Sequence, residues 1–196
     1  MRKSIAIPVI LVLSALVATF VCFIGDLITK EFHPVKYSEF VTKYSAEYNV
    51  PEPIIYAVIK TESSFKPDAK SHKGAIGLMQ ITPATFEWLC SKTGELANPS
   101  LLYDPETNIR YGTYYLSLLH SEFQVWDTVY AAYNAGRGKV NEWLSSEEYN
   151  NHGRLKNIPY KETAEYVKKV GKRAQTYEKL YFSEAETIKE SVISDS

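Results

Sequence analysis

Residues 56–80 read YAVIKTESSFKPDAKSHKGAIGLMQ, and this stretch decides how the rest of the chain is interpreted. Its first half is typical of a helix, because Ile55, Val58 and Ile59 recur on one face at a spacing of about 3.6 residues. At about 100° per residue, Glu62 lies within roughly 20° of Ile55 and continues the apolar stripe. The pattern therefore places one carboxylate on the side of a helix that packs against the core.

A carboxylate on the core side of a helix is costly unless it is paired or neutral. Burial of this kind raises the pKa of a glutamate from about 4.3 towards 6 or above, which is the range that a proton donor needs near neutral pH. The sequence therefore makes Glu62 a candidate general acid. The alternative is that Glu62 lies at the end of its helix and turns into solvent, since glutamate is seldom fully buried.

Length and composition limit the classes of protein to consider. The chain has 196 residues, which is room for one domain of ordinary size and a small appendage. A net charge of -1, with both signs mixed along the chain, gives no support for a nucleic-acid binder, which needs a basic face. The 15 tyrosines suit sugar or peptide surfaces, although most are expected to be half-buried residues on helix faces.

The cysteines and histidines predict neither a disulfide nor a metal site. Cys22 falls in a hydrophobic segment near the N-terminus, which leaves Cys90 without a partner in the folded region. The 4 histidines are scattered along the chain without the spacing of metal ligands. No metal and no cofactor is expected.

An uncharged run of 22 residues, 4–25, follows Arg2 and Lys3. A helix of that length spans about 30 Å of hydrocarbon, enough to cross a membrane. A cleaved signal peptide has a shorter apolar region and a small-residue cleavage site, which the end of this run, TFVCFIG, lacks. We therefore expect an uncleaved single-pass anchor in a bacterial cell membrane, with the residues after 26 on the outer side. Secretion after signal cleavage is the alternative.

The rest of the chain predicts a mainly α domain without internal repeats. Proline and N-cap signals open helices at residues 51–53, 82–83 and 104–105, and Gly136 is placed to end another in a left-handed conformation. Strand-like alternation is scarce. Further helices are expected at 127–134, 140–144 and 164–180, and loops at 66–76, 94–103 and 150–159.

Four short stretches depart from ordinary helix patterns. They are ESSF at 62–65, GAIGLMQ at 74–80, AAYNAG at 131–136 and ETAEYV at 162–167. The two glycines of the second stretch allow positive φ and a close approach of the backbone, and Gln80 interrupts an apolar run there. Each of the last three also has an ordinary structural interpretation, namely a loop turn, a helix end and an acidic first turn of a helix.

Taken together and in this order, the four stretches resemble those of the lytic transglycosylase family with a lysozyme-like catalytic domain, and more distantly goose-type lysozymes. The resemblance covers about residues 37–180. It implies a mainly α fold of the α+β lysozyme-like superfamily, with a single globular catalytic domain behind the N-terminal transmembrane helix. The expected domains are the anchor with a short linker at 1–30, the catalytic domain at 31–182 and a flexible tail at 183–196.

The resemblance also implies an activity on peptidoglycan glycan strands. The family cleaves the β-1,4 bond between N-acetylmuramic acid and N-acetylglucosamine, leaves 1,6-anhydro ends and uses one glutamate as acid and base. By resemblance that residue is Glu62, and a monomer without nucleic-acid partners is expected. The positions that match the family's substrate-binding residues are Ser71, Met79, Gln80, Tyr133, Asn134 and Glu162.

A single carboxylate is unusual, because most glycosidases use two. One suffices if the attacking nucleophile belongs to the substrate, and no second catalytic carboxylate is evident in the sequence. Three alternatives remain open at this point. The first is a muramidase in which water attacks, the second is a wall-binding module without activity, and the third is a membrane-anchored platform for protein interactions.

Overall fold

The computed structural model describes residues 3–183, apart from the side chains of residues 3–10, 12, 22 and 26. The chain divides after Pro34 into two compact units. Except for Ser183, the predicted tail at 183–196 lies outside the described residues. The elements are α1 Lys3–Phe32, α2 Ser38–Tyr48, α3 Glu52–Glu62, α4 Pro83–Thr93, the 3-10 helix η1 Pro99–Tyr103, α5 Pro105–Phe123, α6 Trp126–Ala135, α7 Arg137–Leu144, β1 Asn150–Asn151, β2 Arg154–Leu155, α8 Lys161–Tyr177 and the π-helical turn η2 Glu178–Phe182.

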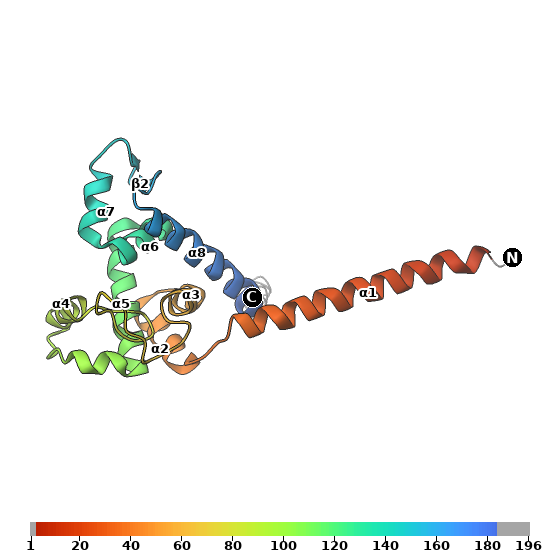
Figure 1. Ribbon diagram of the computed structural model, residues 1–196, viewed down its shortest axis with the longest axis horizontal. Coiled ribbons are helices and arrows are strands. Elements are labelled where there is room, and N and C mark those ends of the chain that lie inside the picture. The colour runs from red at the N-terminus through yellow and green to blue at the C-terminus, as the bar shows by residue number, and fades with distance from the viewer. Residues whose placement is uncertain (1–2, 184–196) are drawn as a thin grey trace, which may run out of the picture. The chain divides into compact units, whose positions relative to one another are not determined.

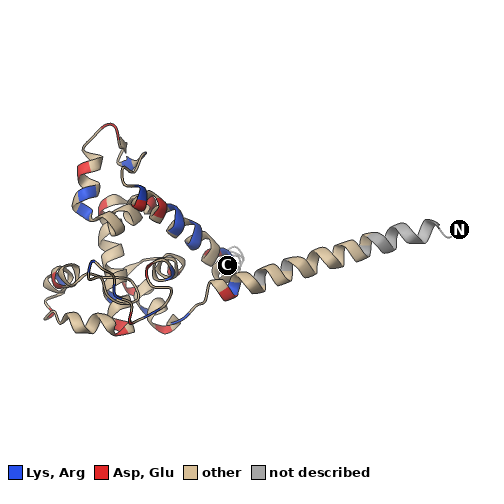
Figure 2. Cartoon of the chain, viewed as in Figure 1, with Lys and Arg blue, Asp and Glu red and all other residues tan. Residues whose placement is uncertain are grey.

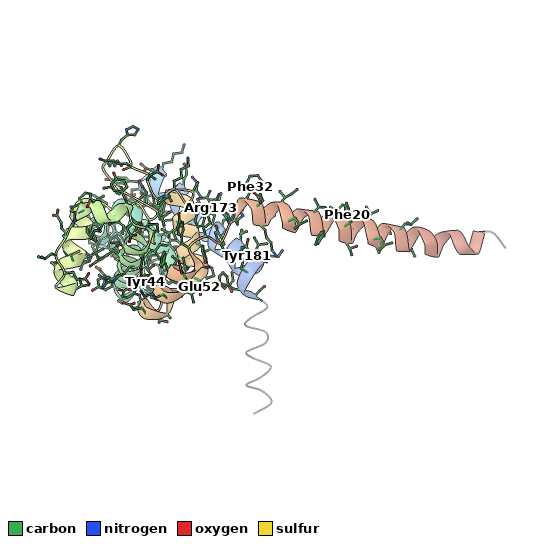
Figure 3. All side chains as sticks on the ribbon, turned by 90° about the horizontal axis from the view of Figure 1, so that it is seen from below. Phe20, Phe32, Tyr44, Glu52, Arg173 and Tyr181 are labelled. Atoms are coloured by element: carbon green, nitrogen blue, oxygen red, sulfur yellow. The ribbon has the colours of Figure 1, made fainter. Side chains whose placement is uncertain are left out.

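The first unit consists of the helix α1. Its segment Leu13–Phe32 is long and apolar enough to cross a membrane, with a mean hydropathy of 1.7. Phe20 and Phe32 project outward from this helix, and each is 65% exposed (Figure 3). α1 therefore has the length and composition of a signal sequence or a membrane anchor.

The second unit is mainly helical, as the sequence predicts. α3 packs against α8, α8 packs against α6, and α5 lies against both α2 and α6 (Figure 1). α3 is buried on every side from Pro53 to Ile59, so it forms the centre of the core. α8 buries one stripe and exposes the rest, which is the pattern of a helix at the surface of a domain. That buried stripe consists of Thr163, Tyr166, Val167, Val170, Ala174 and Tyr177.

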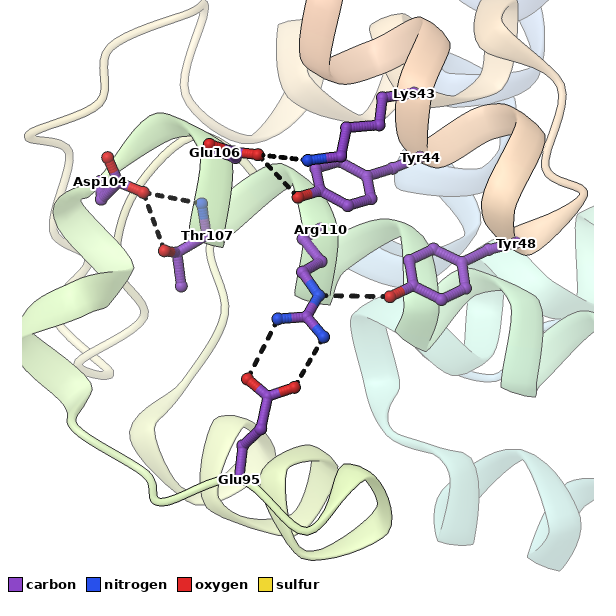
Figure 4. Close-up of polar contacts among 8 residues, drawn as sticks. All are labelled: Lys43, Tyr44, Tyr48, Glu95, Asp104, Glu106, Thr107 and Arg110. Atoms are coloured by element: carbon purple, nitrogen blue, oxygen red, sulfur yellow. Dashed lines mark hydrogen bonds and ion pairs between the residues drawn. The ribbon is translucent and has the colours of Figure 1, made fainter.

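Two helices start with the predicted caps. The Thr82 hydroxyl accepts a hydrogen bond from the Thr85 N–H at 3.2 Å, and the Asp104 carboxylate accepts one from the Thr107 N–H at 2.8 Å (Figure 4). A proline follows each capping residue at the first helical position. Gly136 does separate α6 from α7, but its φ of 93° and ψ of 140° differ from the predicted left-handed conformation.

Two segments predicted as loops contain short regular elements. Residues 94–103 include η1, whose start is capped by the Asn98 side chain accepting a hydrogen bond from the Ser100 N–H at 3.2 Å. Residues 150–159 begin with the antiparallel pair β1 and β2. The turn between these strands places His152 and Gly153 at φ values of 53° and 83°. Both elements are too short for hydrophobic periodicity to reveal them.

A polar network joins α2, α5 and the end of α4 (Figure 4). The Glu106 carboxylate accepts hydrogen bonds from the Lys43 ammonium group at 2.7 Å and from the Tyr44 hydroxyl at 2.9 Å. The Arg110 guanidinium donates two hydrogen bonds to the Glu95 carboxylate, at 2.6 and 3.0 Å. Partly exposed ion pairs contribute little stability, so we assign this network to fixing how the helices are oriented.

The GAIGLMQ loop at 74–80 is held from below by Asn108 of α5. This fully buried side chain accepts a hydrogen bond from the Met79 N–H at 2.7 Å and donates to the carbonyls of Ile76 at 2.9 Å and Leu102 at 2.7 Å. A Cβ at Gly77 would lie 2.2 Å from the Asn108 amide nitrogen, so only glycine fits there. One buried amide therefore fixes the path of the loop.

Replacing the buried Asn108 with alanine is expected to destabilise the domain. The change leaves a buried N–H and two buried carbonyls without this partner, and each such group costs about 1–3 kcal/mol. We predict that Asn108→Ala lowers the free energy of unfolding in urea by about 3 kcal/mol. The control is Asn141→Ala, since the Asn141 amide bonds Glu122 on the exposed surface. Equal losses in the two variants would contradict the role of Asn108.

Candidate active site

Glu62 is the last residue of α3, and the chain turns sharply after it. Ser64 and Phe65 have φ values of 51° and 65°, a region that non-glycine residues rarely adopt and that ends the helix. The Ser63 hydroxyl donates a hydrogen bond to the Leu78 carbonyl at 2.8 Å and so ties this turn to the 74–80 loop. Backbone strain of this kind is often found at functional sites.

Glu62 does not turn freely into solvent. Its Oε1 accepts a hydrogen bond of 2.7 Å from the hydroxyl of Tyr166, which comes from α8 and is 8% exposed. The Glu62 side chain itself is half-buried. The contact crosses the interface between α3 and α8, so the packing of these two helices sets where the carboxyl group lies.

Burial raises the pKa of Glu62 from 4.5 to about 7, while the hydrogen bond from Tyr166 acts in the opposite direction and lowers it. A group with a pKa of about 7 is protonated in about half of the molecules at neutral pH. Glu62 therefore has the acidity of a residue that both donates and accepts a proton in one reaction cycle.

Tyr133 of α6 is placed close to Glu62. Its hydroxyl donates a hydrogen bond to the Met79 carbonyl at 2.8 Å. Burial, and next the nearby charge of Glu62, hold the pKa of Tyr133 well above its usual value, and the same two causes act on Tyr166. Both phenols are therefore neutral hydrogen-bond donors at physiological pH.

Asn134 connects the end of α6 to the start of α8. Its Oδ1 accepts a hydrogen bond from the Thr163 hydroxyl at 2.8 Å, and Thr163 is buried. This bond and the Tyr166–Glu62 bond lie about one turn apart on the same face of α8. The start of α8 therefore positions residues from both of its neighbours, α3 and α6.

A hollow of about 230 Å³ lies beside Tyr133 and Asn134. Gln80 and Ile81 line it from the loop that precedes α4, and Tyr115 lines it from α5. The walls combine aromatic rings, hydroxyl groups and amides, a composition that suits a polar ligand with apolar faces. Three of the predicted binding residues, Gln80, Tyr133 and Asn134, thus line one cavity.

Gln80 and Ser71 also hold the loop that carries them. Gln80 adopts a φ of 51°, and its Nε2 donates hydrogen bonds to the carbonyls of Ala69 at 3.1 Å and Gly77 at 2.9 Å. The Ser71 hydroxyl accepts a hydrogen bond from the Ala75 N–H at 3.0 Å. Gln80 lines the hollow, whereas Ser71 does not.

The side chains of Met79 and Glu162 do not line the hollow. The Met79 side chain is 0% exposed and fills the space next to Gly112, where a Cβ would come within 2.3 Å of its sulfur. Only its backbone reaches the site, through the carbonyl that Tyr133 binds. Glu162 is exposed in the first turn of α8.

Asp68 and Asp104, which the sequence left as other carboxylates to consider, have ordinary surroundings. Asp68 is exposed in the loop, and Asp104 caps α5. Within residues 3–183, no group of three or more His, Cys, Asp and Glu side chains is arranged to hold a metal ion. Burial and Tyr166 account for the pKa of Glu62, with no neighbouring acid among the causes.

The sequence analysis did not identify Tyr166, Thr163 or Asn108 as site residues. Thr163 and Tyr166 belong to the ETAEYV stretch, where only Glu162 was selected. A helical wheel offers a usable signal, because both fall on the apolar stripe of α8 and a buried hydroxyl requires a partner. Asn108 also falls on the buried side of its helix, α5. Its partners Met79 and Ile76 lie 29 and 32 residues earlier in the chain, and no local sequence pattern predicts such a contact.

Comparison with known proteins matches this geometry to one family. Residues 39–155 match the family described as Transglycosylase SLT domain. The soluble lytic murein transglycosylase of Escherichia coli K12 is 36% identical over 152 residues, covering 72% of this chain and 23% of that protein. The membrane-bound lytic murein transglycosylase C of Edwardsiella ictaluri is 39% identical over 125 residues, covering 58% of this chain and 34% of that protein.

The solved structures that this chain resembles are also lytic transglycosylases. The 70 kDa soluble lytic transglycosylase of Escherichia coli superposes with a TM-score of 0.72 at 33% identity, over 79% of this chain and 26% of that one. An inactive glutamate-to-glutamine mutant of the lytic transglycosylase Slt from Pseudomonas aeruginosa superposes with a TM-score of 0.67 at 34% identity, over 76% of this chain and 25% of that one. The chain thus spans about a quarter of the length of these soluble relatives.

The raised pKa of Glu62 predicts a specific dependence of stability on pH. The folded chain binds this proton up to a pH of about 7, whereas the unfolded chain loses it near 4.5, so the wild-type protein is destabilised as the pH rises through that interval. Glu62→Gln has no such titration. We predict that the free energy of unfolding of Glu62→Gln in urea rises by about 3 kcal/mol relative to that of the wild type between pH 4 and pH 8.

The matched control is Glu165→Gln, which removes an exposed carboxylate from α8 and should follow the wild-type pH dependence. Parallel curves for the wild type and Glu62→Gln would show that Glu62 is not held in a desolvated site.

Proposed function

The chain belongs to the Transglycosylase SLT domain family, and on that premise we propose that it is a peptidoglycan lytic transglycosylase. It cleaves the β-1,4 bond between N-acetylmuramic acid and N-acetylglucosamine and leaves 1,6-anhydro-N-acetylmuramic acid ends. The observation that carries the proposal is a single half-buried carboxyl group, Glu62, with a pKa of about 7. It lies close to Tyr133, which lines the polar hollow, although Glu62 is not itself among the lining residues.

Glu62 acts first as a general acid. In its protonated form it donates the proton to the glycosidic oxygen, and the bond between that oxygen and C1 of the muramic acid breaks as positive charge develops on the sugar ring. The leaving sugar departs with a free hydroxyl group. Glu62 is left as a carboxylate, to which Tyr166 continues to donate its hydrogen bond.

Glu62 then acts as a general base. The carboxylate accepts the proton of the C6 hydroxyl of the same muramic acid while O6 forms a bond to C1, which closes the 1,6-anhydro ring. The proton returns to Glu62, and no water is consumed. An internal nucleophile replaces a bimolecular attack, so the second carboxylate that most glycosidases need is not required.

Tyr166 and Tyr133 position the acid and its surroundings. Tyr166 holds Oε1 of Glu62, and Tyr133 braces the Met79 carbonyl of the loop opposite. Because both phenols are neutral donors, neither competes with Glu62 for the proton. We assign Gln80 and Asn134 to sugar contacts in the hollow that they line.

Ser71, Met79 and Glu162 have their proposed roles by family resemblance. Ser71 would contact the sugar near the cleaved bond, and Glu162 would help to bind and orient the strand from the exposed start of α8. Met79 would take part through its backbone, since its side chain is fully buried. In the Pseudomonas aeruginosa relative, the mutant with one glutamate replaced by glutamine is inactive, which supports an essential glutamate in this chain as well.

The proposed location of the enzyme follows from α1. We propose that it is an uncleaved anchor that holds a monomeric catalytic domain, residues 31–182, at the outer face of the bacterial membrane. The apolar segment Leu13–Phe32 supports this, and so does the existence of relatives described as membrane-bound. Anchoring limits the peptidoglycan within reach and contributes nothing to the chemistry.

Replacing Glu62 with glutamine should abolish turnover and spare binding. The amide keeps the size of the side chain but carries no acidic proton, and general acid–base catalysis contributes about 10²–10⁴-fold to a rate. We predict that Glu62→Gln releases at least about 10³-fold fewer muropeptides from purified peptidoglycan while still co-sedimenting with it. Liquid chromatography with mass spectrometry measures the products.

The same assay separates the two reaction types. Wild-type products should be one water lighter than those of a muramidase, because they carry anhydro ends. Glu165→Gln serves as the control and should retain full activity, since its carboxylate is exposed. Reducing ends from the wild type would establish a hydrolase, and retained activity in Glu62→Gln would remove Glu62 from the mechanism.

Removing residues 1–30 should separate location from chemistry. We predict that the shortened chain stays in the supernatant after membranes are sedimented and releases muropeptides at the rate of the detergent-solubilised full chain. The reason is that the residues around Glu62 all lie after Val35. A shortened chain that is folded but inactive would assign α1 a role in catalysis.

A further inference from the structure

Cationic residues gather along α8 of the catalytic domain although the chain has a net charge of -1. Residues 166–177 of α8 contain four cationic side chains and no carboxylate. The sequence analysis treated the charges as evenly mixed and overlooked this segment. Blue bands follow one another along α8 in Figure 2, after the acidic residues of its first turns. We call the following residues the basic face: Lys36, Lys60, Lys169, Lys172 and Arg173.

The members of the basic face come from three segments that pack together. Lys169 and Lys172 are exposed on α8. Arg173 reaches α3, where its guanidinium donates a hydrogen bond to the Thr61 hydroxyl at 2.8 Å. Lys60 precedes Thr61 on α3, and Lys36 lies just before α2.

Lys60 lies close to Arg173 and Lys36, and Lys169 is one helical turn from both Lys172 and Arg173 on α8. The pKa of Lys60 is below its usual value because of burial first, and then because of the positive charges of Arg173 and Lys36. The ion pairs found among residues 3–183 involve other lysines and arginines, namely Lys43, Arg110, Arg137, Lys139 and Lys161. Like charges held together in this way favour an anionic ligand outside the chain.

Chain length places the basic face near a membrane if α1 crosses one. α1 ends at Phe32, and Lys36 follows four residues later. Four extended residues reach at most about 14 Å, and the headgroup region on one side of a bilayer is roughly 5–8 Å deep. Lys36 and the side chains clustered with it are therefore tethered within reach of the lipid headgroups.

We propose that the basic face binds the headgroups of anionic phospholipids in the membrane that holds α1, and so sets how the catalytic domain stands on that membrane. The inference rests on the anchoring proposed above. The orientation is compatible with catalysis, because Lys60 and Glu62 lie about 160° apart around α3. Headgroups at Lys60 leave the Glu62 side of the helix free for a glycan strand.

The charge of the peptide stems of peptidoglycan offers a different anionic ligand. Lipid is favoured because Lys36, the member of the face closest to α1 in the chain, cannot leave the headgroup region by more than the length of the short linker. Stem peptides therefore enter the experiment as an outcome that would overturn the proposal.

The experiment uses the full chain in lipid nanodiscs, so that α1 holds the protein in every sample. One set contains phosphatidylcholine, and the other contains phosphatidylcholine with 40% phosphatidylglycerol. A water-soluble acylating reagent labels the native lysines, and mass spectrometry gives the rate at each site. Lys92 of α4 and Lys139 of α7 are the internal controls, because neither belongs to the basic face.

We predict that Lys36, Lys60, Lys169 and Lys172 are labelled at least about fivefold more slowly in the anionic discs, since each cation near such a surface favours binding by about that factor. The two control lysines should be labelled equally in both discs. Salt at 0.5 M should remove the difference by screening. The double variant Lys169→Gln/Lys172→Gln should return Lys36 and Lys60 to within about twofold of their rates in phosphatidylcholine, whereas Lys92→Gln/Lys139→Gln should not.

Equal rates in both discs would overturn the proposal. So would protection that appears in phosphatidylcholine discs only when stem-bearing peptidoglycan fragments are added, which would assign the face to substrate. Failure of the chain to enter either disc would reject the anchor and the docking with it. None of these outcomes bears on the enzymatic proposal, because muropeptide release is assayed separately.

Discussion

The hydrogen bond between the Tyr166 hydroxyl and Glu62 is the interaction on which the site depends. It joins the end of α3 to the start of α8, and these two helices pack closely along their length. Burial alone would push the pKa of Glu62 upwards, and the phenol limits that rise so that the group titrates at about 7. A carboxyl group poised in this way serves as acid and as base in turn.

The remaining polar groups keep that geometry in place. Asn108 fixes the 74–80 loop from below, Ser63 ties the loop to the end of α3, and Tyr133 binds the same loop through the Met79 carbonyl. Each of these side chains bonds to a backbone atom of the loop, in addition to the bonds that Ser71 and Gln80 make within it. This explains why the loop lines a stable hollow, and why Met79 is a core residue whose backbone alone reaches the site.

Much of this could be predicted from the sequence, for identifiable reasons. Apolar periodicity located α3 and the unusual place of Glu62 on it, and the caps at Thr82 and Asp104 marked where helices begin. Local patterns cannot report contacts between distant segments, such as Tyr166 with Glu62 across 104 residues. For the same reason the side-chain burial of Met79 was not foreseen, because it depends on Gly112 of another helix.

The central claim is that Glu62 is a shielded acid whose proton is available near neutral pH. The most direct test is a carbon-13 NMR titration of the glutamate side-chain carboxyl groups in the folded protein, with Glu62→Gln used to assign the signal. The account predicts a midpoint of about 7 for Glu62 that moves upwards in Tyr166→Phe, where the hydrogen bond that lowers it is lost. A midpoint near the ordinary value of 4.5, unchanged in Tyr166→Phe, would contradict it.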